Sequence, residues 1–141
     1  MKTKVHTISG EAEFRLIGIA SHLSDYKISW LLNEKLNFRL SKSDDLVLSL
    51  PTSKNIQRFS TFKYEIESGL LFTLFSNRSD LAILVKDHKN VDYLLKIEGN
   101  ISDSEISDLA NKIKKLKNII TVFEVEIKTL KTKELDVLGK N

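Results

Sequence analysis

Two carboxylates and an imidazole lie within six residues of one another in the second half of the chain. Asp87 and His88 are followed four residues later by Asp92. Such groups could bind a divalent cation or transfer protons. In an extended chain, however, His88 and Asp92 share one face while Asp87 points to the other. The spacing therefore favours a polar turn that leads into a strand over a catalytic or metal-binding cluster.

Asp92 and Tyr93 form the most specific polar and aromatic pair in the sequence. Apolar residues alternate with polar ones after Asp92, which predicts a strand with Tyr93 on its core face. We expect the Tyr93 hydroxyl to reach a hydrogen-bond partner. Asp92 then points to the opposite face, where Arg78 or Lys96 could pair with it. The alternative is that Asp92 belongs to a binding surface.

Several kinds of site are excluded by residue types that the chain lacks. It contains no cysteine, so disulfides, thiolate catalysis and cysteine-ligated metals are ruled out. There is no Gly-x-Ser-x-Gly segment, and the five glycines are too scattered to form a phosphate-binding loop. We therefore assign no catalytic residue, no cofactor and no metal ligand, and we do not expect an enzyme.

The hydrophobic pattern predicts an α+β fold in which two principal helices pack on one face of a mainly antiparallel sheet. The expected order is β-α-β, a β-meander and a second β-α-β, and residues 91–127 resemble half of a ferredoxin-like or ACT-type domain. The helices are expected to begin at the caps Ser24 and Ser102 and to end near Asn37 and Asn118. We expect strands at 13–20, 38–40, 46–50, 62–67, 70–76, 81–85, 91–98 and 119–127, a polar turn at 41–45 and a mobile loop at 52–60.

The composition predicts one soluble domain over residues 1–141. The 22 basic and 19 acidic residues give a net charge of +3, and the single proline and few glycines leave no linker. We expect residues 1–10 to be frayed or peripheral, and residues 128–141 either to fray or to dock as a short segment. No long apolar run follows the basic N-terminus, so we expect a cytoplasmic protein that does not bind membranes.

The segment Val85–Tyr93 resembles the signature of the bacterial IPExxxVDY family. Val91-Asp92-Tyr93 is intact, Asp87 stands at the position of the family's Glu, and Lys86 replaces its Pro. Residues 13–37 and the turn at Ser76-Asn77-Arg78 also look like the family. The resemblance implies a small bacterial cytoplasmic protein and assigns it no reaction. It selects as motif residues Asp87, Val91, Asp92, Tyr93, Asn77 and Arg78.

A non-catalytic interaction or regulatory module is the function that the sequence favours. Tyr26 and Trp30, one helical turn apart, could anchor an unknown protein partner, although they could equally form the packed edge of their helix. Apolar residues on both faces of several strands suggest self-association through a sheet edge or a sheet face, because two helices cover only one face.

Two other functions stay open. A small-ligand sensor could use the turn at Gly99-Asn100-Ile101 of the ACT-like half. An RNA-associated protein could use the lysine-rich helix end at residues 112–117, which includes Lys114 and Lys117. Nucleic-acid binding is less favoured, because the same lysines suit the solvated C-terminal end of a helix.

Overall fold

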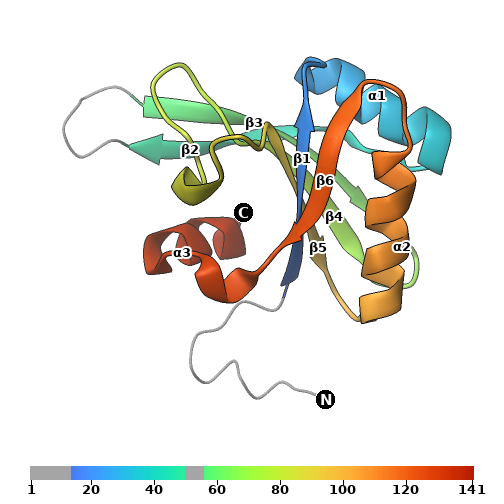
Figure 1. Cartoon of the computed structure of the whole chain (residues 1–141). Helices are drawn as coiled ribbons and strands as arrows, with labels where there is room; N and C mark the ends of the chain where they lie inside the picture. Colours follow the sequence, from blue (N-terminus) through green and yellow to red (C-terminus); the bar gives the residue numbers. More distant parts are fainter. Residues whose placement is uncertain (1–13, 50–55) are drawn as a thin grey trace.

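The computed structural model describes residues 14–49 and 56–141 (Figure 1). The expectations for residues 1–13 and 50–55 lie outside the described residues. The elements occur in the order β1 (Phe14–Ser21), α1 (Asp25–Leu36), β2 (Ser41–Ser49), β3 (Ile56–Glu65), β4 (Leu71–Ser76), η2 (Lys86–His88), β5 (Tyr93–Glu98), α2 (Asp103–Lys114), β6 (Ile119–Val125), η3 (Ile127–Thr129) and α3 (Thr132–Lys140).

The six strands form a single antiparallel sheet in the order β2-β3-β4-β5-β1-β6. The predicted α+β class is therefore confirmed. Strand β1 lies between β5 and β6, so β5, α2 and β6 form a split β-α-β unit of the ferredoxin type. Strands β2, β3 and β4 extend the sheet on the far side of β5 as a meander.

Helices α1 and α2 cover one face of the sheet, which we call the helical face (Figure 1). Ile28 and Leu32 of α1 and Ile106 and Ile113 of α2 are buried against apolar strand residues there. Both expected N-caps are present: Ser24 accepts a hydrogen bond from the Lys27 amide, and Ser102 forms a capping box with Glu105. Local signals thus place both helices as the sequence predicts.

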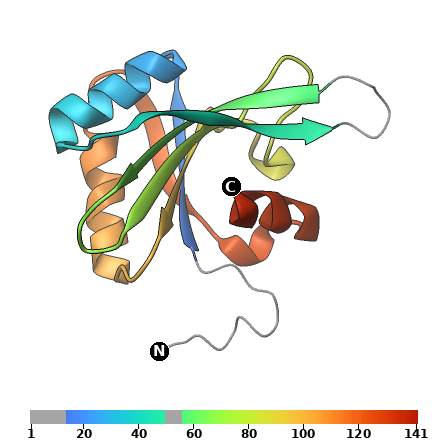
Figure 2. The same cartoon turned by 180° about the vertical axis from the view of Figure 1, so that it is seen from behind.

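The opposite face of the sheet, which we call the C-terminal face, is covered by the chain itself. Helix α3 and the segment 77–91 lie on this side, away from α1 and α2 (Figure 2). Leu130 and Leu138 are buried there with Phe59 and Phe75. Of the two alternatives for residues 128–141, the docked segment is what the structure has. This cover also removes the argument that a second subunit must cover an open sheet face.

Four local predictions were wrong. Residues 38–40, expected to form a strand, lie outside every strand, between the end of α1 at Leu36 and the start of β2 at Ser41. Residues 41–45 belong to β2, where a bulge between Ser43 and Leu46 accommodates the polar residues, rather than to a turn. Residues 56–60, expected in a loop, are the first half of β3, because Gln57 and Phe59 are buried. Residues 81–85 form no strand and make only the isolated bridge of Arg78 to Ile83. The amides of the buried Leu84 and Val85 instead donate to Asn77. None of the described helices is long and apolar enough to cross a membrane.

Candidate functional site

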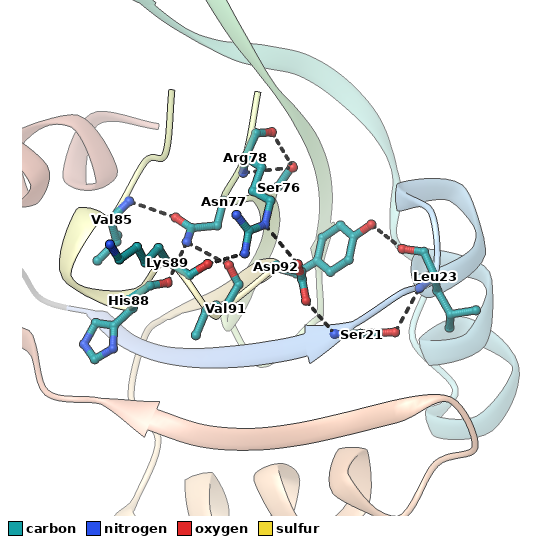
Figure 3. Close-up of polar contacts among 11 residues, drawn as sticks. Ser21, Leu23, Ser76, Asn77, Arg78, Val85, His88, Lys89, Val91 and Asp92 are labelled. Carbon is teal, nitrogen blue, oxygen red and sulfur yellow. Dashed lines mark hydrogen bonds and ion pairs between the residues drawn. The ribbon is translucent and has the colours of Figure 1, made fainter. Parts of the chain in front are cut away.

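Asp92 joins the end of β1 to the turn after β4 (Figure 3). Its Oδ2 accepts a hydrogen bond from the Ser21 amide at 2.8 Å, and its Oδ1 accepts one from Arg78 Nε at 3.0 Å. The backbone of Asp92 also bonds to both sides, since its amide donates to the Ile19 carbonyl and its carbonyl accepts from the Asn77 amide. Arg78 is one of the two partners that the sequence suggested for Asp92. Both carboxylate oxygens therefore accept hydrogen bonds that link the end of β1 to the turn after β4.

Asn77 holds the segment 77–91 in place. Its side chain is fully buried, and Nδ2 donates to the carbonyls of His88 at 3.0 Å and Val91 at 2.9 Å. Its Oδ1 accepts from the Val85 amide at 2.8 Å. Three backbone groups without a place in the sheet thus find a partner in one side chain (Figure 3). We call Asn77, Arg78, Asp92 and Tyr93, with the groups they bind, the motif network.

Tyr93 anchors the start of α1 to β5. Its ring is buried on the helical face, and its hydroxyl donates to the Leu23 carbonyl at 2.5 Å. Burial, and then the negative charges of Asp25 and Asp92, raise the pKa of Tyr93 to about 12. The phenol therefore keeps its proton to a higher pH than an ordinary tyrosine, which suits its role as a hydrogen-bond donor.

The remaining motif residues lie on different sides of this network. Val91 is buried on the C-terminal face, where its Cγ2 would lie 3.1 Å from a Cβ added to Gly18. Asp87 is exposed, with Lys131 Nζ 3.9 Å away. The His88 ring packs beside Phe123 at 5.5 Å between centroids. Asp87, His88 and Asp92 therefore do not converge, and no group of three or more His, Asp or Glu side chains suited to a metal occurs among the described residues.

A polar cleft opens beside the motif network. It has a volume of about 500 Å³, and Tyr93 and Arg78 form part of its wall. The other walls come from the start of α1, from β2 and β3, and from the turn after β4: Asp25, Lys42, Asp45, Ile56, Gln57, Arg58, Ser60, Ser76, Ser79 and Asp80. The motif residues thus shape the cleft mainly by positioning its walls.

Tyr26 and Trp30 lie together on the outer surface of α1. The side chains are 62% and 61% exposed, although the Tyr26 ring also meets Phe62 edge to face at 5.4 Å. Of the packed helix edge that the sequence offered as an alternative, the structure therefore has only the contact between Tyr26 and Phe62. Both residues therefore expose more than half of their surface to solvent.

Lys96 is a residue whose environment sequence analysis missed. The alternating pattern placed it with Asp92 and Glu98 on a charged face, yet its side chain is only 1% exposed. Lys96 Nζ donates to the Leu138 carbonyl near the end of α3 at 2.7 Å and lies 3.2 Å from Glu98. Burial lowers the pKa of Lys96, against the opposing effect of Glu98. The apolar residues of 128–141 were the signal that something covers this face.

The residues named for the two other hypotheses lie elsewhere. Lys112, Lys114, Lys115 and Lys117 are all exposed around the end of α2. The turn at Gly99 follows the end of β5, whereas the cleft lies at its beginning, beside Tyr93. The geometry therefore separates the expected ligand turn from the cleft.

We compared the chain with protein-family models and with curated proteins. Neither comparison finds a match. The resemblance to the IPExxxVDY family stays a prediction that rests on the motif residues themselves.

Proposed function

We propose that the protein is a non-catalytic interaction module that binds a partner protein through the outer surface of α1. One observation carries the proposal: Tyr26 and Trp30 stand exposed one turn apart on a helix whose opposite side is firmly packed. Tyr and Trp contribute most often to binding energy at protein interfaces. The exposed Lys27 and Glu34 beside them would supply the polar rim that such interfaces have.

The contacts of the motif residues support this proposal. The side chains of Asn77, Asp92 and Tyr93 form hydrogen bonds with backbone groups and with Arg78. Such contacts suit residues that hold a shape rather than residues that react. A bacterial origin, a cytoplasmic location and membership of the IPExxxVDY family belong to the same proposal, and the first and the last of these rest on the resemblance alone.

The direct test uses three versions of the tagged protein as bait in nuclease-treated extract of the source cells. Wild type and Leu81→Ala should capture the same partner, whereas Trp30→Ala should lose it. Leu81 is a matched control because it is 63% exposed but lies outside α1. Identical capture by all three baits would contradict the proposal. Capture that needs intact RNA would favour the lysine-rich end of α2 instead.

A second readout comes from Trp30, the only tryptophan of the chain. Its emission should shift to shorter wavelength when the purified partner is added, because the ring leaves water. A blue shift that grows with the concentration of the protein alone would identify the partner as a second copy. Unchanged emission in a complex that forms would place the interface elsewhere.

A further inference from the structure

The charges that line the polar cleft balance, and half of the charged side chains are in ion pairs. Lys42 Nζ lies 2.5 Å from Asp45 Oδ1, and Arg78 bonds to Asp92. Asp25 accepts hydrogen bonds from Ser60 Oγ at 2.6 Å and from the Tyr26 amide at 2.8 Å. Among the described residues, Asp25, Arg58 and Asp80 are the charged wall residues without an ion pair, and of these Asp25 already accepts hydrogen bonds at both of its oxygens.

Arg58 and Asp80 are brought to the same cleft by one buried side chain. Gln57 Oε1 accepts hydrogen bonds from Ser79 Oγ at 2.5 Å and from the Leu81 amide at 2.9 Å. These two donors flank Asp80, and Gln57 immediately precedes Arg58. The Gln57 side chain that accepts both hydrogen bonds is itself buried. One positive and one negative side chain of the cleft lining thus come from two segments that the Gln57 side chain links.

We infer that the cleft binds a small zwitterion, an α-amino acid, with its carboxylate on Arg58 and its ammonium group on Asp80. Guanidinium binds carboxylate through two parallel hydrogen bonds, and an aspartate accepts hydrogen bonds from an ammonium group. The cleft volume of about 500 Å³ lies in the range of small-molecule sites. Ile56 on the wall offers an apolar contact for a side chain.

The charge balance argues against other ligand classes. Three basic and three acidic side chains line the cleft, so its lining carries no formal net charge. A dianion such as a phosphate ester would meet Asp25, Asp45 and Asp80, and a divalent cation would meet the three basic groups. A ligand that carries both charges and no net charge meets neither repulsion. The inference does not depend on the proposed function, because α1 contributes only Asp25 to the cleft.

The test is a titration of the ¹⁵N-labelled protein, first with each common L-amino acid and then with L-leucine and its two deletion analogues. Binding should give saturable amide shifts confined to residues 57–60 and 76–81. We expect 4-methylpentanoate, which lacks the amino group, and 3-methylbutylamine, which lacks the carboxylate, to bind at least about tenfold more weakly than leucine. Analogues that bind as well as leucine would overturn the zwitterion assignment.

Two substitutions test whether the ligand binds to Arg58 and Asp80. Arg58→Gln and Asp80→Asn should each weaken binding of the best amino acid by about tenfold or more. The matched controls Arg39→Gln and Asp108→Asn change exposed residues outside the cleft and should leave the affinity unchanged. All four residues are exposed, and the amide spectrum shows directly whether each variant is folded. No saturable shift in the cleft with any amino acid at millimolar concentration, or equal affinity in all four variants, would overturn the inference.

Discussion

The two faces of the sheet are covered in different ways. On the helical face, α1 and α2 are twelve residues long, begin at serine caps and bury an apolar layer. On the C-terminal face, the nine-residue α3 and the irregular segment 77–91 cover the sheet and bury its apolar residues. Polar side chains fix that second layer: Asn77, Glu134 and Lys96 are buried and bond to backbone groups. One face is thus held by apolar packing between regular elements, and the other depends on hydrogen bonds to an irregular chain.

Leu94 and Leu95 allow the two layers to be compared within one strand. Both are fully buried neighbours in β5 and point to opposite faces. We expect Leu95→Ala, under the two helices, to lower the free energy of unfolding by about 4 kcal/mol, and Leu94→Ala by about 2–3 kcal/mol. The C-terminal layer is the smaller and less regular one, so it can close partly around the cavity. Urea unfolding measures both, and a loss for Leu94→Ala equal to or above that for Leu95→Ala would break the comparison.

Asn77 tests whether hydrogen bonds hold the irregular layer. Asn77→Ala leaves the Val85 amide and two carbonyls without their partner in a buried site, which we expect to cost about 3 kcal/mol of unfolding free energy. Asn90→Ala, an exposed position of the same segment, is the control and should change stability by less than about 0.5 kcal/mol. If the two substitutions cost the same in urea unfolding, segment 77–91 is held by its apolar residues instead.

Substitution of Tyr93, on the helical face, should have a smaller effect on stability, and that effect should depend on pH. Tyr93→Phe should cost about 1 kcal/mol near neutral pH through the lost bond to Leu23. The folded-state pKa of about 12 lies above the ordinary value of 10, so between pH 10 and 12 the unfolded chain releases this proton while the folded chain keeps it. Stability contributed by the phenol is therefore lost as the pH rises through this window. Urea unfolding at several pH values should show a steeper decline for wild type than for Tyr93→Phe, and parallel declines would contradict the raised pKa.

Lys96 should show the smallest global effect and the opposite pH dependence. Lys96→Met replaces a buried charge by an apolar chain of similar length, and we expect global stability to change by less than about 1 kcal/mol in either direction. The Leu138 carbonyl nevertheless loses its donor, so amide hydrogen exchange should accelerate in α3 and not in α2. Unchanged exchange in α3 would mean that Lys96 does not hold this helix.

The direction in which Lys96 changes stability with pH follows from its lowered pKa. Between that lowered folded-state pKa and the ordinary value of 10.5, the unfolded chain keeps a proton that the folded chain has released. The contribution of Lys96 to stability therefore rises with pH in that window and is lost as the pH falls through the folded-state pKa. Comparison of wild type with Lys96→Met isolates this rise, which should be absent in the variant.

Local patterns determined the elements of the helical face. Ser24, Ser102 and Glu105 satisfy helix ends through neighbours in sequence, and the apolar spacing of α1 and α2 repeats within a few residues. Alternation likewise predicted the strand that begins near Tyr93 and the inward direction of its ring. These features depend on residues close together in the chain, so the sequence alone was sufficient to predict them.

Tertiary structure alone decided the C-terminal face and the cleft. The burial of Lys96 depends on α3, which lies more than 30 residues later, and the shape of segment 77–91 depends on Asn77 rather than on any repeat. The cleft joins residues of α1, β2, β3 and the turn after β4, which only the strand order brings together. A charged side chain that is buried by a distant helix carries no local signature, because its environment is made by residues that it meets only after folding.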